Sequence, residues 1–200
     1  MHSNMYRHYI IPIYSREHSP QSWVGTGFLI NDHLITAGHV ISRYQKYYAW
    51  IAGTQVELLP ELWIPTLLPA ADKLGYDVAI YPLPGVESPL RLADEDPAKH
   101  EHLDVLCWQR TAEGLQQVAT TGVVRGECDE DGYFHFATAR HITHGSSGSP
   151  IMHGDLVYGL VAMGRHQGDN TIKASSALQR TMEENTCWAF KATHINRFMR

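Results

Sequence analysis

Hydrophobic residues along this chain occur in short runs that are bounded by glycine, proline or polar turn residues. Runs of this length and spacing are typical of many strands rather than of a few long helices. The chain is therefore predicted to be mostly β. The predicted strands are Tyr6–Tyr14, Trp23–Ile30, His33–Thr36, Tyr47–Ile51, Val78–Leu83, Leu103–Gln109, Leu115–Val124, Tyr133–Thr138, Leu156–Met163 and Cys187–Lys191.

The segments between these strands divide the chain into two halves. Residues 87–102 are charged and contain prolines, which is typical of a linker, so we predict one β-barrel over residues 1–92 and a second over 93–200. The polar stretch Arg165–Thr186 predicts a long surface loop, either a flap over a cleft or an irregular loop of no special role. Thr193 precedes apolar residues at helical spacing, and this predicts a short C-terminal helix.

Composition excludes several kinds of partner. The chain carries 16 Lys and Arg against 21 Asp and Glu, a formal net charge of -5, and it has no basic stripe for phosphate backbones. A hydrophobic content of 44% suffices for a buried core. No apolar run approaches the about 20 residues that a membrane helix needs. We therefore expect neither nucleic acid nor a membrane as a partner.

Cysteine usage and the amino terminus predict a location. Cys107, Cys128 and Cys187 are odd in number and widely spaced, so they form neither a disulfide framework nor a CxxC metal site. Each is expected to be a small buried hydrophobe. Met1–Ile10 lacks the apolar stretch and the cleavage site of a secretory signal. Both observations predict a cytoplasmic protein in a reducing compartment.

Three segments join a reactive side chain to a strand or a tight turn. Thr-Ala-Gly-His places His39 just after a buried strand. Asp77 opens the apolar run that ends at Leu83, and Gly145–Pro150 is a run of small residues that permits a sharp turn around a hydroxyl, that of Ser147. An imidazole base, a carboxylate and a hydroxyl are the groups that nucleophilic catalysis by serine requires.

Each of these residues also has a simpler interpretation. An isolated histidine such as His39 is more often a satisfied core residue, and Asp77 could only begin a strand. Its rival Asp72 lacks an apolar run after it. The serine segment could be a plain Gly/Ser linker, in which Ser146 and Ser149 are equivalent in composition to the candidate. The setting of each residue favours catalysis by His39, Asp77 and Ser147.

The three segments together resemble a known family. Thr36–Val40, Asp77–Ile80 and Gly145–Pro150 are similar to the His, Asp and Ser motifs of the trypsin/chymotrypsin-like serine proteases, in the forms of intracellular bacterial and HtrA-like members. The resemblance extends over nearly the whole chain. It implies an all-β fold of two perpendicular six-stranded β-barrels, with His39 and Asp77 on the first barrel and Ser147 on the second.

The resemblance also assigns roles. His39 is the implied general base, Asp77 orients it, and Ser147 is the nucleophile. The backbone N–H groups of Gly145 and Ser147 are the implied oxyanion donors. The implied substrate-binding residues are His141, His144, Ala162, Met163 and Gly164, whereas Trp188, like Met163, is more often a core residue.

Several positions depart from the secreted members of that family. Val40 stands where they carry a cysteine, and the uncharged Ser146 stands where their zymogens carry an aspartate. The corresponding activation ion pair is therefore excluded, although Ile10-Ile11 resembles a cleaved start. His141 lies six residues before Ser147, where trypsin carries an aspartate, so cleavage after Lys or Arg is not expected.

These observations predict a serine endopeptidase that acts on protein or peptide substrates without a cofactor. Regulation by a protein partner is a further expectation. The histidine pairs His141/His144 and His100/His102 lack other ligands at recognised spacing, so no metal is expected. Two alternatives remain: a catalytically silent peptide-binding or scaffold module on the same fold, and an esterase or acyltransferase that uses the same nucleophile.

Overall fold

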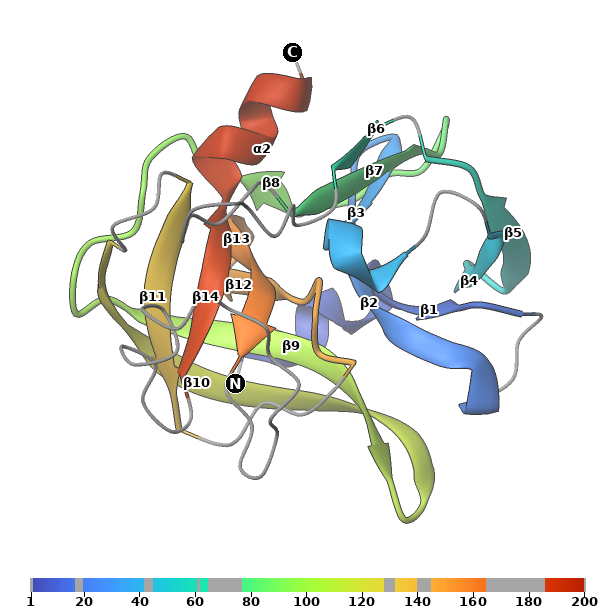
Figure 1. Ribbon diagram of the computed structural model, residues 1–200, viewed down its shortest axis with the longest axis horizontal. Coiled ribbons are helices and arrows are strands. Elements are labelled where there is room, and N and C mark those ends of the chain that lie inside the picture. Colours follow the sequence, from blue (N-terminus) through green and yellow to red (C-terminus); the bar gives the residue numbers. More distant parts are fainter. Residues whose placement is uncertain are drawn as a thin grey trace, which may run out of the picture.

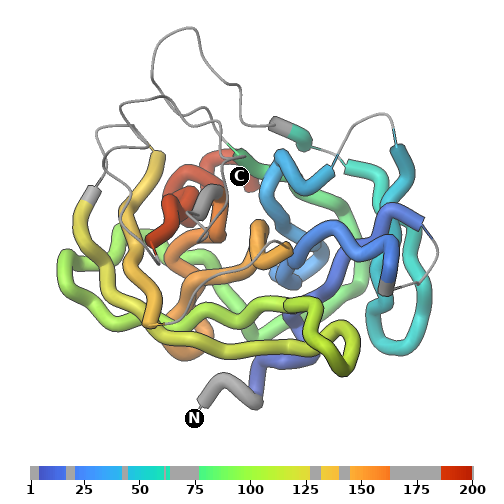
Figure 2. The backbone as a smooth tube through the Cα atoms, turned by 60° about the horizontal axis from the view of Figure 1, so that its bottom comes forward, coloured from blue at the N-terminus to red at the C-terminus, as the bar shows by residue number. Residues whose placement is uncertain are grey.

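Strands make up most of the computed structural model, which describes residues 2–16, 20–41, 45–60, 62–64, 77–127, 132–139, 145–164 and 186–199. Two curved sheets lie side by side, and a short helix follows the last strand (Figure 1). The tube in Figure 2 shows the same arrangement from another direction, with the first sheet in blue to green and the second in green to red. The all-β double-barrel fold class is confirmed.

The first sheet contains seven strands among the described residues, in the order β5-β4-β1-β2-β3-β7-β6. All of its pairings are antiparallel. A turn at Asn31-Asp32 joins β2 to β3, as expected, and Asp32 takes the left-handed conformation there. The strands are β1 (Ile10–Tyr14), β2 (Trp23–Ile30), β3 (His33–Thr36), β4 (Tyr47–Ile51), β5 (Thr54–Leu58), β6 (Leu62–Ile64) and β7 (Val78–Pro82).

The second sheet closes on itself. β12 pairs with both β9 and β13, so six strands form a ring, and β8 adds to β13 in parallel. The seventh strand of this sheet is thus an attachment to the barrel. The strands are β8 (Arg91–Leu92), β9 (His102–Thr111), β10 (Gly114–Glu127), β11 (Tyr133–Thr138), β12 (Pro150–His153), β13 (Leu156–Gly164) and β14 (Thr186–Lys191). The domain boundary at residue 92 stays a prediction.

Short helices complete the described part of the chain. The C-terminal helix α2 spans Ala192–Met199, and three 3-10 helices are η1 (His2–Tyr9), η2 (Pro20–Ser22) and η3 (Gly38–Val40). The prediction of a strand from Tyr6 was wrong for Tyr6–Tyr9, which belong to η1. Tyr6 and Tyr9 lie three residues apart and both pack against the core, which matches the three-residue period of a 3-10 helix.

The buried apolar residues form three clusters. One cluster lies within each sheet, and the third is shared between the two sheets. The shared cluster takes Phe28 and Ile35 from the first sheet, Leu160 and Phe190 from the second, and Ile195 from α2. Burial of such side chains contributes about 1.5–3 kcal/mol each, so the shared cluster fixes one half against the other.

Two of the cysteines are buried and free, as expected. Burial raises the pKa of the Cys107 thiol to about 11 and that of Cys187 to about 12. Trp188 lies in the shared core, in agreement with its core interpretation. Cys128, most of the predicted loop Arg165–Thr186 and the rival acid Asp72 lie outside the described residues. None of the described helices is long and apolar enough to span a membrane.

Candidate active site

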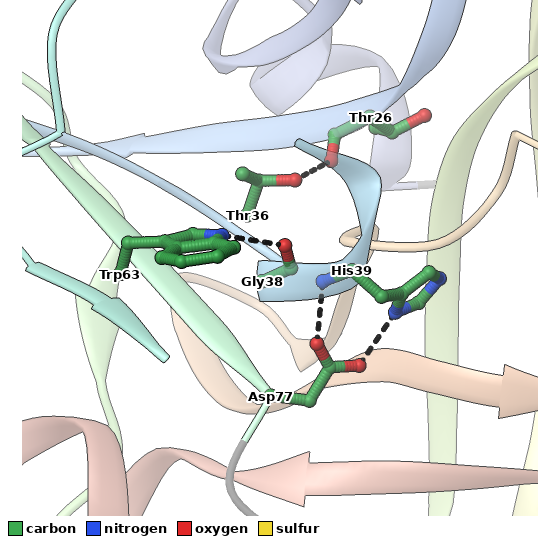
Figure 3. A network of polar contacts seen from close by, with 6 residues as sticks. All are labelled: Thr26, Thr36, Gly38, His39, Trp63 and Asp77. Carbon is green, nitrogen blue, oxygen red and sulfur yellow. Dashed lines mark hydrogen bonds and ion pairs between the residues drawn. The ribbon is translucent and has the colours of Figure 1, made fainter. Parts of the chain in front are cut away.

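His39 and Asp77 are brought together by the pairing of β3 with β7. His39 lies in η3, just after β3, and Asp77 directly precedes β7. Because Thr36 pairs with Ala79 in antiparallel register, the residues beyond Thr36 meet those before Ala79. The Nδ1 atom of His39 lies 2.6 Å from Oδ2 of Asp77, and the backbone N–H of His39 donates to Oδ1 at 2.8 Å (Figure 3).

The environment of this pair fixes its protonation. Asp77 is fully buried, while the His39 side chain is 39% exposed. Burial alone lowers the pKa of His39, but the charge of Asp77 and its hydrogen bond raise the pKa further than burial lowers it. Since Asp77 can only accept when ionised, Nδ1 carries the proton and Nε2 keeps a free lone pair. The geometry therefore provides an oriented base.

This raised pKa predicts the acid limb of any reaction that needs neutral His39. We expect kcat/KM to fall as the pH drops through a value above 6.5, the ordinary pKa of histidine. Stability runs in the opposite direction. The pair of protonated His39 and Asp77 adds to the free energy of unfolding. This contribution is fully present below pH 6.5 and is lost as the pH rises through the raised pKa of His39.

The measurement is a pH profile of kcat/KM on a peptide substrate, together with thermal melts over the same pH range. An acid limb at or below pH 6.5 would show that Asp77 does not raise the pKa of the base. The Asp77→Asn variant, discussed below, is the matched comparison.

The serine candidates lie on a sharp turn between residues 145 and 149. Gly145 has φ +89° and Gly148 has φ +87°, conformations that favour glycine. The N–H of Gly148 donates to the carbonyl of Val161 at 2.7 Å, and the N–H of Ser149 donates back to Ser146 at 3.0 Å. A Cβ atom at Gly148 would lie only 2.0 Å from the carbonyl oxygen of Thr26, so this position has no room for a side chain.

The same turn lies against the strand end that carries His39. The N–H of Thr26 on β2 donates to the carbonyl of Ser147 at 3.1 Å. A Cβ atom added at Gly148 would also come within 3.0 Å of the backbone nitrogen of Ala37, two residues before His39. Among the described residues, no hydrogen bond joins the Ser147 hydroxyl to the His39 imidazole. Contact between these two groups therefore stays a prediction.

The predicted oxyanion donors lie on this turn. Within the described ranges, the N–H groups of Gly145 and Ser147 donate to no other protein group. The ring of Trp23 packs against Gly145, where an added Cβ would lie 2.0 Å from the ring. The role of the two N–H groups remains a prediction.

The other predicted residues have different surroundings. Ala162 is buried in the shared core. Met163 and Gly164 lie in β13 opposite Trp188 and Cys187. His141 and His144 lie outside the described residues, so the substrate pocket stays a prediction. In the part of the chain that the structure describes, no group of His, Cys, Asp and Glu could hold a metal ion.

Two residues that sequence reasoning missed also hold this site. Trp63 on β6 donates its indole N–H to the carbonyl of Gly38 at 3.0 Å and so braces η3 beside His39. The hydroxyl of Thr26 donates to the carbonyl of Gly145 at 2.9 Å. Nothing in the sequence pattern marks Trp63. Thr26 lies between two glycines, Gly25 and Gly27, which is a weak sign of a close backbone approach.

Comparison with known proteins gives a family for residues 25–163, which match the model of the trypsin-like peptidase domain. This range contains His39, Asp77 and Ser147 and covers more than half of the chain. A search of curated proteins finds no match.

Solved structures with the same fold include several proteases. The active form of Rv3671c protease from M. tuberculosis is 19% identical with a TM-score of 0.66, covering 98% of this chain and 81% of its own. Neuropsin, a serine protease of mouse brain, is 14% identical with a TM-score of 0.69, covering 100% and 96%. The HtrA-type protease AlgW, solved with a decapeptide, is 12% identical with a TM-score of 0.68, covering 99% and 65%. At these identities the likeness concerns the fold.

Proposed function

Since the chain belongs to the trypsin-like peptidase family, we propose that it is a serine endopeptidase that works through His39, Asp77 and Ser147. The observation that carries the proposal is the His39–Asp77 pair, in which a fully buried carboxylate accepts both from the imidazole at 2.6 Å and from the backbone of the same residue at 2.8 Å. A base that is held so firmly suits proton transfer better than it suits a purely structural role.

The proposed reaction has two stages. In the first, the Ser147 oxygen attacks the carbonyl carbon of the peptide bond while its proton passes to Nε2 of His39. The N–H groups of Gly145 and Ser147 donate hydrogen bonds to the negatively charged oxygen that forms from the carbonyl, and Asp77 stabilises the imidazolium. His39 then gives its proton to the departing amine, which leaves an acyl ester on Ser147.

In the second stage, water hydrolyses this ester. His39 takes a proton from the water as the water oxygen attacks the acyl carbon, and the same two N–H groups donate hydrogen bonds to the oxyanion. The proton then returns to the Ser147 oxygen as the acid product leaves. The cycle needs no cofactor.

The finer parts of the proposal rest on individual residues. His141, preceded by Arg140, stands at the sequence position where trypsin carries an aspartate, so we propose a preference other than Lys or Arg. The uncharged Ser146 supports activity without an amino-terminal ion pair. The free buried thiols of Cys107 and Cys187 suit a reducing compartment, which supports a cytoplasmic site of action. The proposed substrates are proteins or peptides. A regulatory partner remains a prediction.

A fluorophosphonate probe tests the proposal on the intact wild-type protein. We expect the folded protein to be phosphonylated at a single serine, and peptide mapping by mass spectrometry to place the label on Ser147 rather than on Ser146 or Ser149. Heat-denatured protein is the control and should not react.

Three other results would contradict the endopeptidase. No labelling of folded protein would favour the catalytically silent peptide-binding module. Labelling of Ser147 without cleavage of any peptide in a diverse library would favour the esterase or acyltransferase. A label on Ser149 would overturn the assignment of the nucleophile.

A further inference from the structure

Thr26 is fully buried on β2 and makes four hydrogen bonds with three other segments. Its N–H donates to the carbonyl of Ser147 at 3.1 Å, and its hydroxyl donates to the carbonyl of Gly145 at 2.9 Å. Its own carbonyl accepts from the hydroxyl of Thr36 at 2.7 Å (Figure 3). The N–H of Trp108 on β9 donates to the Thr26 hydroxyl oxygen at 3.2 Å. One first-sheet residue thus binds the serine turn at two points.

The direction of the hydroxyl proton follows from these partners. A hydroxyl has one proton to donate, and the backbone N–H of Trp108 can only donate. The Thr26 oxygen therefore accepts from Trp108 and directs its proton to Gly145. Because the site is buried, loss of the hydroxyl would leave both the Trp108 N–H and the Gly145 carbonyl without this partner.

Gly145 is the residue of the turn that most needs such a partner. It has φ +89° and no side chain, so its backbone has more conformations available than any other residue type would have. The ring of Trp23 limits it from one side through contact alone. The Thr26 hydroxyl adds a directional bond that fixes the plane of the peptide between Gly145 and Ser146.

Together with other bonds, this contact fixes the successive peptides of the turn. The peptide unit between Ser146 and Ser147 is held at its carbonyl oxygen, which accepts from the N–H of Ser149 at 3.0 Å. The peptide unit between Ser147 and Gly148 is held at both ends. Its carbonyl oxygen accepts from the N–H of Thr26, and its N–H donates to the carbonyl of Val161. The Thr26 hydroxyl supplies the anchor for the first peptide, next to both predicted oxyanion donors.

We propose that Thr26 is a positioning residue that aims the N–H groups of Gly145 and Ser147 at the developing oxyanion. This inference rests on the proposed function. The bonds join β2 of the first sheet to a turn that belongs to the second, and Gly145 lies 119 positions after Thr26 in the sequence. The oxyanion geometry is therefore set from the barrel that carries the base.

The test compares three variants. Thr26→Ser keeps the hydroxyl. Thr26→Cys differs from Thr26→Ser only in its sulfur, which is a weak hydrogen-bond donor and acceptor. Thr26→Val removes the hydroxyl and keeps the shape of the threonine side chain. We expect kcat of Thr26→Ser within about threefold of wild type, and losses of about 10-fold to 100-fold for Thr26→Cys and Thr26→Val, with KM nearly unchanged.

A peptide aldehyde supplies a readout that a merely structural role would not move. Its hemiacetal with Ser147 places an oxygen on the oxyanion donors, so its inhibition constant should rise in Thr26→Cys and Thr26→Val by the same factor by which kcat falls. Ser88→Ala is the matched control. It removes a 2.6 Å side-chain bond to the carbonyl of Leu29, away from the turn, and should leave both constants unchanged.

The outcomes are distinguishable. Wild-type kcat and aldehyde affinity in folded Thr26→Val would overturn the role of Thr26 while leaving the endopeptidase intact. A change confined to KM would also overturn it. Absence of turnover in the wild type overturns the proposed function and this inference with it. If Thr26→Val does not fold, the Thr26→Ser and Thr26→Cys pair decides, and equal kinetics in these two variants contradict the proposal.

Discussion

The Ser147→Ala variant is expected to lose about 10⁵-fold or more of kcat/KM and all labelling by fluorophosphonate. The loss is large because the alanine variant has no atom that can form the acyl ester. Its fold should be unaffected, since Ser147 is partly exposed and its hydroxyl has no bond among the described residues that folding depends on. Turnover of purified protein on a peptide substrate, corrected by active-site titration of the wild type, measures the effect.

Ser149→Ala is the matched control for that result. Ser149 is fully buried two residues away, and among the described residues its hydroxyl has no hydrogen-bond partner. Removing an unpaired buried hydroxyl costs nothing in hydrogen bonding, so this variant should keep its activity and melt at the same temperature or higher. The prediction is contradicted if Ser147→Ala retains turnover within about tenfold of wild type, or if Ser149→Ala is the inactive variant.

The second large effect is expected for Asp77→Asn, which should lower kcat by about 10⁴-fold. An asparagine offers one acceptor oxygen where Asp77 now serves two donors of His39, and its amide donor favours the wrong tautomer of the imidazole. The charge that raises the pKa of His39 is also lost, so any residual activity should have its acid limb at lower pH than the wild type.

The control for this variant is Asp155→Asn, which removes one negative charge from an exposed pair with Arg91 at 3.0 Å. It should change kcat by less than about twofold, because exposed pairs contribute little and this one lies away from the site. Full activity of folded Asp77→Asn would show that the buried carboxylate only supports the backbone of η3. An unshifted acid limb would show that the pKa of His39 does not depend on it.

The parts of the fold that could be predicted are the strands whose burial follows their hydrophobic pattern. Trp23–Ile30, Tyr47–Ile51 and Tyr133–Thr138 have the predicted bounds because their runs are apolar and end at turn residues. β5 was missed because Thr54–Leu58 is mostly exposed and polar. β8 has only two residues and exists through its pairing with β13, which no local pattern reveals.

The site divides in the same way. The three candidate residues could be selected because their motifs are local and occur in a fixed order. Thr26 and Trp63 could not be, since their partners Gly145 and Gly38 lie 119 and 25 residues away in the sequence. A hydrogen bond to a backbone carbonyl needs no special residue type at the acceptor, so it leaves no signal there.

The division of the site between two barrels determines when, during synthesis of the chain, the site can be assembled. The amino-terminal half leaves the ribosome first, and it carries His39 and Asp77 together with a Thr26 whose N–H and hydroxyl do not yet have their partners on the serine turn. The proposed nucleophile Ser147 and its turn emerge later, and the turn is bound by Thr26 of the first sheet. In the proposed reaction, therefore, a nascent chain carries the base without its nucleophile, and peptide hydrolysis requires both halves to be folded against each other.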